Sequence, residues 1–387
     1  MSIDLFRVCT VRTDLLAYWA DVAGWTIGIV GGNNNHTLEY FDMKAAFLTA
    51  PRRFEIKEVP APKMVNDTDV LIRIKTVGVC GSDMHYYTTG RIGSQVVRYP
   101  FIVGHETAGV VEKIGKGVTR VKPGQRIAID PAVTCGECDQ CKSGRENTCR
   151  NLRFLGAPQQ MDGAQCEYIV LLEKNCFPII DSMTFEQATL CEPLAIAVYA
   201  VDRSPLANGM SVAILGVGPI GMSVFHVLRT TDVGSVFVTD KLDARLDAAR
   251  KLSPKWVGNP NRVEVVKEIS KFEPQQLDIV YECSGDPAAI AQGVRLLKPG
   301  GTLMIVGIPE VGDVSFPIHE LRRKEITIVN VRRQNRCTQK AVELLAEKKV
   351  NMDSLVTHRF PLEETQKAFE LVANYGDGVM KTMIEVG

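Results

Sequence analysis

Four cysteines, Cys135, Cys138, Cys141 and Cys149, stand in the run PAVTCGECDQCKSGRENTCR at the spacing C-x2-C-x2-C-x7-C. Thiolates are soft ligands that bind Zn²⁺ as a tetrahedral set of four. The glycine and charged residues between them allow a short loop to wrap around one ion. Four thiolates leave no open position at the metal, so the spacing predicts a structural zinc site.

Two other structures also use clustered cysteines, namely a disulfide framework and an iron-sulfur cluster. Eleven cysteines among 387 residues are few for a disulfide scaffold, their number is odd, and no secretory signal opens the chain. The C-x2-C-x2-C run occurs at iron-sulfur clusters, but there the fourth cysteine follows after three residues and precedes a proline. Seven residues intervene here, which favours zinc.

A second set of metal-binding residue types is dispersed along the chain. It comprises Cys80 in VGVCGSDMHYY, His105 and Glu106 in VGHETAG, and Glu192 in LCEPLA. A site of cysteine, histidine and carboxylate leaves zinc with an open fourth position, as a catalytic zinc requires. Cys191, beside Glu192, is an alternative sulfur ligand.

A glycine-rich motif, GVGPIG, follows the buried strand pattern SVAIL and precedes a helical pattern. Gly216 permits the tight turn, Gly218 lets the backbone approach a pyrophosphate, and Gly221 allows close helix packing. Pro219 suits the first helical turn, which continues through Ile220. Because the helix N-terminus then faces the phosphates, the motif predicts a dinucleotide-binding site.

The choice between NAD and NADP depends on the residues after the next strand pattern, SVFVTD. This pattern ends at Asp240, 24 residues after Gly216. A carboxylate there accepts hydrogen bonds from the ribose hydroxyls and repels a 2′-phosphate. Lys241 and Arg245 could instead bind that phosphate, but the acidic residue stands at the strand end itself. We therefore expect NAD.

Two kinds of element must position these residues. From residue 43 to about 185, alternating apolar residues in DVLIRIKTVGV, TAGVVEKIG, QRIAID and CEYIVLL predict a compact, barrel-like all-β domain. A helical segment, TFEQATLCEPLAIAVYAV, follows. Strands and helices then alternate through LDIVYECSG, GTLMIVG and EITIVN, which predicts a doubly wound parallel sheet of about six strands.

The loops at the C-terminal ends of these parallel strands are expected to line the cofactor site. Ordinary loop structure is an equally good interpretation for at least half of their residues. The residues expected to meet the nicotinamide half of the cofactor are Cys283, Ser284, Gly285, Val306, Gly307, Ile308, Val331 and Arg332.

The order of these motifs resembles the zinc-dependent medium-chain dehydrogenase/reductase superfamily, and within it the polyol dehydrogenases of the sorbitol dehydrogenase type. The resemblance covers the chain from about Met43 to the C-terminus. It implies NAD and two zinc ions per chain, one catalytic and one structural. It also implies an α/β protein with a GroES-like β-barrel catalytic domain at residues 43–200 and 331–387 and a Rossmann domain at 201–330.

Carried over residue by residue, the resemblance makes Cys80 and His105 ligands of the catalytic zinc. Glu106 is then a ligand or a close carboxylate neighbour, and Glu192 matches the acidic position of the polyol branch, binding zinc directly or through its water. Which of the two carboxylates is the third ligand stays open at this point.

The mechanism that follows is the oxidation of an alcohol. Zinc would act as a Lewis acid on the substrate hydroxyl, and a hydride would pass to NAD⁺ from the carbon that bears this hydroxyl. Glu192 or a zinc-bound water, with Ser82 and His85 as relay residues, would carry the proton toward solvent. Alternatively, His85 is simply packed beside Tyr86, and Ser82 only forms a turn.

The substrate is where the chain departs from the family. Tyr86 and Arg332 match substrate-side positions of the polyol dehydrogenases, but Arg333 stands where an aromatic residue is usual. Guanidinium groups suit carboxylates and phosphates. An acidic sugar such as an aldonate is thus an alternative to a plain polyol, unless Arg333 and Arg336 form salt bridges at a subunit surface.

Two further functions compete with a polyol dehydrogenase. The first is a dehydrogenase for an amino alcohol such as threonine, whose zinc ligands would look similar and which only its substrate would distinguish. The second is a non-catalytic NAD-binding protein that keeps only the structural zinc. The intact set of Cys80, His105 and Glu192 argues against the second.

The composition fits a small-molecule enzyme. Forty-five basic residues balance 45 acidic ones, which argues against an extended nucleic-acid or polybasic membrane contact. The longest apolar stretches are too short to span a membrane. Residues 1–42 resemble no targeting peptide, and either Met43 is the true initiator or residues 13–23 form an extra helix. We expect a cytoplasmic homo-oligomer, a dimer or tetramer by family resemblance.

Overall fold

The computed structural model describes residues 41–387 of the chain. Most of the predicted N-terminal extension, including the alternative helix at residues 13–23, lies outside the described residues. The first strand, β1 (Asp42–Ala50), forms an antiparallel hairpin with β2 (Arg53–Pro60).

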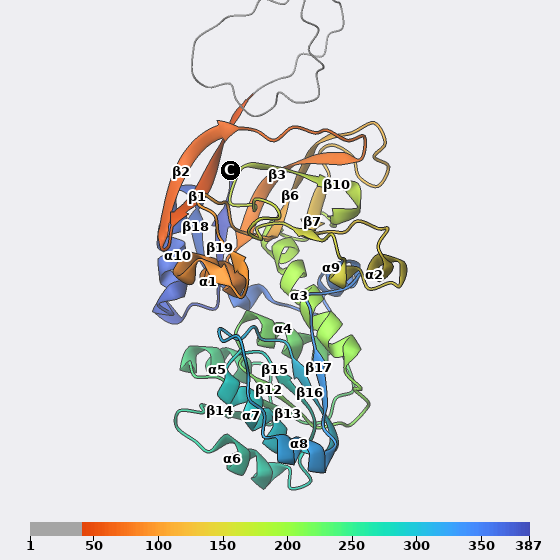
Figure 1. The fold of residues 1–387 in the computed structure, drawn as a ribbon, viewed down its shortest axis with the longest axis vertical. Helices are drawn as coiled ribbons and strands as arrows, with labels where there is room; N and C mark the ends of the chain where they lie inside the picture. Colours follow the sequence, from red (N-terminus) through yellow and green to blue (C-terminus); the bar gives the residue numbers. More distant parts are fainter. Residues whose placement is uncertain (1–40) are drawn as a thin grey trace, which may run out of the picture. The chain divides into compact units, whose positions relative to one another are not determined.

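The first large sheet is mainly antiparallel and has seven strands. Their order is β11-β7-β6-β3-β19-β18, with β10 also paired to β3 (Figure 1). Val70, Ile72 and Ile74 alternate along β3 and are fully buried, as the apolar pattern predicted. The strands are β3 (Asp69–Gly78), β6 (Glu106–Ile114), β7 (Arg126–Ile129), β10 (Tyr168–Leu172), β11 (Cys176–Pro178), β18 (Val356–Pro361) and β19 (Lys381–Glu385).

The second large sheet has six parallel strands in the order β14-β13-β12-β15-β16-β17. The strand order reverses between β12 and β15, and ligands of doubly wound sheets bind at such a switch point. The prediction of about six parallel strands is therefore confirmed. The strands are β12 (Val212–Leu215), β13 (Val236–Thr239), β14 (Trp256–Gly258), β15 (Leu277–Glu282), β16 (Leu297–Ile305) and β17 (Thr327–Asn330).

Five helices belong to the segment that forms this sheet, and they alternate with its strands along the chain. Side chains of α6 and α7 are buried with one set of strand residues, and side chains of α4 and α5 with another. The helices are α4 (Pro219–Leu228), α5 (Asp243–Arg250), α6 (Val265–Phe272), α7 (Pro287–Leu296) and α8 (Ile318–Lys324).

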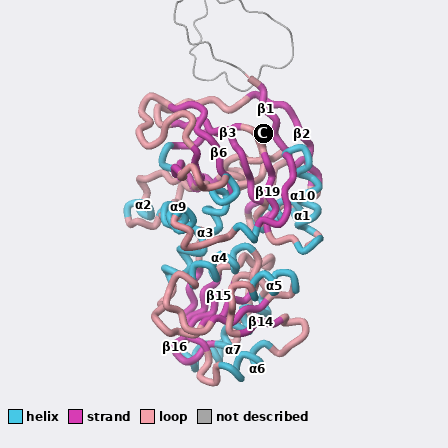
Figure 2. Tube along the Cα trace, turned by 180° about the vertical axis from the view of Figure 1, so that it is seen from behind, coloured by secondary structure: helices cyan, strands magenta, loops and turns pink. Residues whose placement is uncertain are grey.

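Helix α3 (Phe185–Arg203) packs against both sheet regions. The hydroxyl of Thr184 accepts a hydrogen bond from the Gln187 N–H, and the side-chain oxygen of Gln187 accepts one from the Thr184 N–H, forming a capping box. The helix contacts β6 and β7 at one side and α4 at the other (Figures 1 and 2). One continuous apolar core includes α3 residues, Ala108 of β6 and Val212 of β12.

The remaining elements are short and connect or cover the two sheets. The domain limits at residues 200 and 330 stay predictions. Across residues 41–387, no helix combines the length and the apolar character that crossing a membrane would need. The elements are α1 (Gly81–Thr89), α2 (Asp139–Lys142), α9 (Thr338–Ala346), α10 (Thr365–Ala373), β4 (Arg91–Ile92), β5 (Gln95–Val96), β8 (Ala132–Val133), β9 (Arg153–Phe154), η1 (Glu146–Thr148), η2 (Glu173–Asn175), η3 (Asp353–Leu355), η4 (Leu362–Glu364) and η5 (Gly376–Gly378).

Candidate functional site

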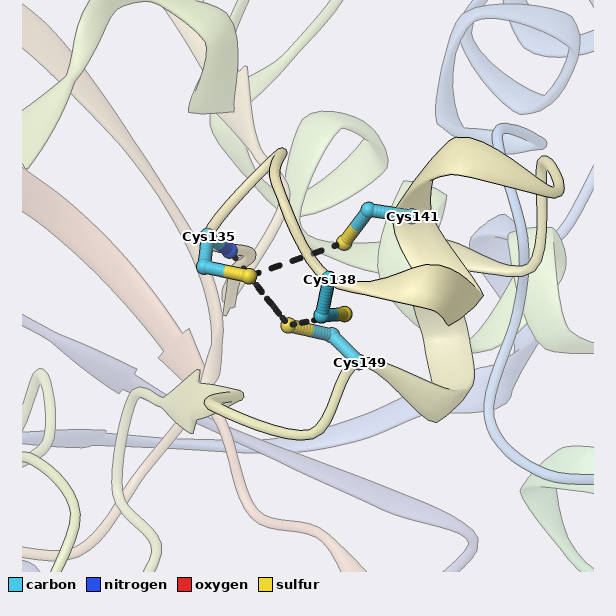
Figure 3. Close-up of side chains that lie close together, drawn as sticks. All are labelled: Cys135, Cys138, Cys141 and Cys149. Atoms are coloured by element: carbon cyan, nitrogen blue, oxygen red, sulfur yellow. Dashed lines mark hydrogen bonds between the residues drawn. The ribbon is translucent and has the colours of Figure 1, made fainter.

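The four clustered cysteines lie in the segment that joins β8 to β9, and their side chains converge on one point (Figure 3). The sulfur of Cys135 lies 4.0 Å from that of Cys141 and 3.4 Å from that of Cys149, and Cys138 lies 3.9 Å from Cys149. Four sulfurs around one Zn²⁺ at its usual Zn–S length would stand about 3.8 Å apart. The ten cysteines of residues 41–387 are all free thiols. The donor set therefore fits a zinc ion.

The charges in this cluster also favour a cation. N–H donors of Cys141 and Arg150 lower the pKa of the Cys138 thiol to about 6, while burial raises the pKa of the Cys141 thiol to about 12. Thiols this close cannot all become thiolates without a positive charge between them. A zinc ion would supply that charge.

The second cluster forms where two neighbouring strands meet. Cys80 follows the end of β3 and is the N-cap of α1, while Glu106 begins β6 and is the register partner of Gly78. His105 immediately precedes Glu106. One ligand atom each from Cys80, His105 and Glu106 lies within 4.8 Å of the others. The antiparallel pairing of β3 with β6 therefore brings together residues that are far apart in the sequence.

Asp83 supports this cluster and is not among the residues selected from the sequence. It is fully buried on α1. Its carboxylate lies 3.4 Å from Nδ1 of His105 and accepts a hydrogen bond from the N–H of Cys80 at 3.1 Å. Although burial by itself lowers the pKa of His105, Asp83 and Cys80 outweigh it and raise that pKa. The surroundings therefore stabilise positive charge, as a metal site must.

Lys381 of β19 is the second residue that sequence reasoning missed. Its ammonium donates to both carboxylate oxygens of Glu106, at 2.8 and 2.6 Å, and to the carbonyl of Val79. Both charged side chains are 1% exposed. Burial lowers the pKa of Lys381, but the Glu106 carboxylate outweighs it and raises that pKa. Lys381 lies 275 residues from Glu106 in the sequence, so no local spacing could predict that the two form a pair.

Glu192 lies near this cluster but outside its compact set of three. It sits on α3, is 5% exposed, and its Oε2 is buried without a hydrogen-bond partner among the described residues. Burial raises the pKa of Glu192 to about 7, and the charge of His105 partly opposes the shift. The neighbouring Cys191 thiol instead contacts the carbonyl of Gln187. A buried, unpartnered carboxylate beside a cation site fits a metal or a substrate hydroxyl.

The three other candidates near this cluster lie on α1. The hydroxyl of Ser82 donates to the sulfur of Cys80 at 3.4 Å. The side chain of His85 is 21% exposed and lies 3.7 Å from a carboxylate oxygen of Glu310. Tyr86 is buried, and its surroundings raise the pKa of its phenol to about 12.

The glycine motif forms the turn between β12 and α4. Gly216 has φ +90°, in the left-handed region that glycine adopts without strain. A side chain at Gly221 would collide with the carbonyl of Gly216, so close packing there requires glycine. Gly218 is the N-cap of α4, Pro219 occupies its first turn and Ile220 follows. The N-terminus of α4 is thus available to an anion.

The acidic residue after β13 contacts the same turn. Asp240 is buried, and its carboxylate accepts hydrogen bonds from the N–H groups of Val217 and Leu242, both at 2.9 Å. Arg245 lies 3.9 Å from this carboxylate. The ammonium of Lys241 forms an ion pair with Asp286 at 2.5 Å, so its charge is already compensated.

The predicted nicotinamide-side loops follow β15, β16 and β17, and the first two of these loops contact each other. The backbone of Gly285 approaches that of Ile308, and Gly307 lies against Gly285. Their organising residue is the fully buried Glu282, which sequence reasoning missed. Its carboxylate accepts hydrogen bonds from the N–H and hydroxyl of Ser284 and the N–H of Gly285.

The remaining cofactor-side candidates lie next to these loops. The N–H of Cys283 donates to the carbonyl of Leu215 in β12. The N–H of Val306 donates to the carbonyl of Glu282, and that of Val331 to the carbonyl of Ile305. These hydrogen bonds continue the backbone pairing beyond the strand ends.

The arginine-rich loop after β17 contacts the four-cysteine lobe, residues 131–154. The carbonyl of Arg332 accepts a hydrogen bond from Asn147, and Arg336 pairs with Glu146 at 2.6 Å. The guanidinium carbon of Arg333 lies 3.4 Å from the centre of the Phe154 ring. Arg336 thus pairs within this chain, and the alternative of salt bridges from Arg333 and Arg336 at a subunit surface stays a prediction.

Two family models match the chain. Residues 66–181 match the alcohol dehydrogenase GroES-like domain, and residues 219–347 match the zinc-binding dehydrogenase domain. The chain belongs to the zinc-binding dehydrogenases. The predicted family, fold class and enzyme type are confirmed, and zinc and a nicotinamide cofactor go with them.

Relatives of this zinc-binding dehydrogenase include the sorbitol dehydrogenase of Bacillus subtilis, 37% identical over 89% of this chain and 97% of the relative. Among solved structures, L-idonate 5-dehydrogenase of Escherichia coli is 25% identical with a TM-score of 0.83, and covers 89% of this chain and 99% of its own. A Sinorhizobium meliloti protein, described as a zinc-binding dehydrogenase and solved with NADP, is 29% identical with a TM-score of 0.82. The match covers 89% of this chain and 99% of that protein.

Proposed function

We propose that this protein oxidises a secondary alcohol of a polyol or sugar derivative to a ketone and transfers the hydride to NAD⁺. The observation that carries the proposal is the convergence of the partly buried Cys80 with the buried His105 and Glu106, in a chain that also contains a dinucleotide-type glycine turn. The likeness to a sorbitol dehydrogenase supports a polyol as the substrate class.

The catalytic zinc would be held by Cys80, His105 and Glu106, with Glu192 close by. When bound, it supplies a Lewis acid that lowers the pKa of the substrate hydroxyl. Asp83 orients the imidazole of His105 through Nδ1, so that the other ring nitrogen, Nε2, is available as a zinc ligand. Lys381 donates hydrogen bonds to both oxygens of the Glu106 carboxylate. These contacts fix the donors before the substrate arrives.

The proton of the substrate hydroxyl needs an acceptor, and Glu192 is well suited. Its Oε2 has no hydrogen-bond partner among the described residues, and its pKa is raised to about 7 by burial. A group with this pKa accepts and releases a proton near neutral pH. Ser82 and the partly exposed His85 are the proposed relay toward solvent.

The proposed cofactor site begins at the N-terminus of α4, where Gly218 is the proposed point of backbone approach to the pyrophosphate, while Gly216 forms the turn and Gly221 packs against it. Asp240 is the proposed partner of the adenosine ribose. Its carboxylate favours NAD because a 2′-phosphate would be repelled, and Lys241 is already paired with Asp286. Residues of the β15, β16 and β17 loops are the proposed contacts of the nicotinamide half.

We also propose that the enzyme works in the cytoplasm as a homo-oligomer, either a dimer or a tetramer. Three large apolar side chains, Ile308, Val311 and Ile318, are at least half exposed in the segment that leads to the edge strand β17. Such residues favour association with a second chain. Sedimentation equilibrium measures the molar mass directly, and a monomer would contradict the proposal.

The decisive experiment is an NAD⁺ reduction assay over a panel of polyols and sugar acids, with zinc counted by elemental analysis. We expect two zinc ions per chain in the wild type and one in Cys80→Ser, with activity lost together with the second ion. A Cys80→Ser variant that keeps both ions and its activity would contradict the proposed site. An inactive wild type with one zinc would favour a non-catalytic NAD-binding protein.

A further inference from the structure

The guanidinium of Arg333 stands at the edge of the candidate catalytic cluster. It stacks on the ring of Phe154, and the same ring packs against His105 with ring centres 5.3 Å apart. The backbone of Arg333 has φ +53°, which is strained for any residue other than glycine. The fold therefore holds this side chain one aromatic ring away from a proposed zinc ligand.

The charge of Arg333 is not matched by a neighbour. Its Nη1 atom is buried and has no hydrogen-bond partner in residues 41–387. Ion pairs within that range include Arg336 but neither Arg332 nor Arg333. Removing Nη1 from water without a partner is costly, because its desolvation is not offset by a hydrogen bond or an anion.

The nearest acidic groups do not supply the missing charge. Asp130 accepts hydrogen bonds from the Ala132 N–H and from the side chains of Gln334 and Thr338. Glu192 influences Arg333 electrostatically, but no ion pair forms between them among the described contacts. Burial and the charge of Arg332 lower the pKa of Arg333 to about 9.

Lys381 provides the contrast within the same cluster. Lys381 is buried, and both oxygens of Glu106 compensate its charge. The fold thus provides a counter-ion for this buried ammonium and none for the partly buried guanidinium of Arg333. An unpaired cation beside a catalytic cluster fits an anionic group delivered by the substrate.

We propose that the substrate is an anionic sugar derivative whose carboxylate or phosphate pairs with Arg333. This inference rests on the proposed function and narrows its substrate class. A guanidinium can bind either group through two parallel hydrogen bonds. The reaction oxidises a secondary alcohol of the substrate to a ketone, NAD⁺ accepts the hydride, one proton is released, and the anionic group is unchanged.

The test compares three substrates that share one carbon skeleton, namely sorbitol, gluconate and sorbitol 6-phosphate. For the wild type we expect kcat/KM for gluconate or for the phosphate to exceed that for sorbitol. Gluconate would identify a carboxylate site, and the phosphate ester a phosphate site. In Arg333→Met we expect the acid-to-sorbitol ratio of kcat/KM to fall ~100-fold, mainly through KM of the acid, because a desolvated charge pair is lost.

Two further variants exclude a structural effect. Arg333→Lys keeps the charge and should restore part of the preference, whereas a merely structural role would not respond to charge. Arg336→Gln changes an arginine of the same loop that already pairs with Glu146, and should leave the ratio unchanged. Circular dichroism verifies that each variant is folded. A wild type that prefers sorbitol, or an unchanged ratio in Arg333→Met, overturns the inference.

Isothermal titration calorimetry with sorbitol, gluconate and sorbitol 6-phosphate, each added to the enzyme–NADH complex, separates this inference from the proposed function. If sorbitol is oxidised and neither acid binds more tightly than sorbitol, the anion site is wrong and the dehydrogenase proposal stands. If an acid binds through Arg333 but no substrate reduces NAD⁺, the anion site stands and the proposed reaction is wrong.

Discussion

The two candidate metal sites of this protein are built in opposite ways. The four-cysteine site takes all of its ligands from one short loop, and two of them, Cys135 and Cys138, are only partly buried. The catalytic candidate takes Cys80 from the end of β3 and His105 and Glu106 from the start of β6, and a lysine of β19 supports it. One site is defined by local spacing, and the other exists only when the sheet is complete.

The charged side chains around the two sites differ in their exposure to solvent. The lobe places its acidic and basic side chains in solvent, as in the exposed pair between Asp139 and Arg150. The catalytic candidate places Lys381, Glu106 and Asp83 out of water. Solvent screens the first kind of interaction and not the second. Substitutions at the two sites should therefore have very different consequences.

Lys381→Met gives the largest expected effect on stability. It leaves the Glu106 carboxylate buried without its partner, so the free energy of unfolding should fall by about 3–5 kcal/mol. Urea denaturation measures this change. The matched substitution in the lobe, Arg150→Met, breaks an exposed ion pair and should leave the midpoint almost unchanged.

A combined variant, Lys381→Met with Glu106→Gln, isolates the charge. If the uncompensated carboxylate causes the loss, removing it should recover much of the stability of Lys381→Met. Equal destabilisation by Lys381→Met and Arg150→Met would show that burial does not distinguish the two regions.

Asp83→Asn should weaken the second metal site without affecting the first. Asp83 contacts Nδ1 of His105 and the N–H of Cys80, and outer contacts of this kind typically change metal affinity about 10- to 100-fold. Competition with a chromophoric chelator measures the affinity of each zinc. Asp139→Asn in the lobe is the control, and a comparable loss of zinc there would contradict the comparison.

The contrast between the two sites also explains what could be predicted from the sequence. Apolar alternation in DVLIRIKTVGV and the turn GVGPIG each depend on neighbouring residues, so β3, β12 and α4 appear where they were expected. The four cysteines are local in the same sense.

The contacts that could not be predicted join distant parts of the chain. Lys381 reaches Glu106 only because β19 pairs with β3, and no residue near Lys381 signals this. Glu282 appears in the sequence as the last residue of an apolar strand, and its role in holding Ser284 and Gly285 depends on the side chain turning back toward the loop. The environment of Arg333, in the loop after β17, depends on Phe154 of β9.

The smallest effect that should still be measurable links the two sites. The lobe holds the loop of Arg332 and Arg333, because Asn147 donates to the carbonyl of Arg332 and Asn335 donates to the carbonyl of Gly144. Cys141→Ser should remove the lobe zinc and loosen this loop. We expect KM for the alcohol substrate to rise by roughly tenfold, since misplacement of a binding residue costs affinity.

The KM for NAD⁺ should rise less than the KM for the alcohol in the same variant. Among the proposed cofactor contacts only the β17 loop touches the lobe, whereas the glycine turn and Asp240 contact each other. Steady-state kinetics with each substrate varied in turn measures both constants, and elemental analysis verifies that one zinc remains. If KM rises equally for both substrates, the lobe acts on the whole enzyme and not on the loop. If neither constant changes although the lobe zinc is lost, the hydrogen bonds from Asn147 and Asn335 do not position the arginines.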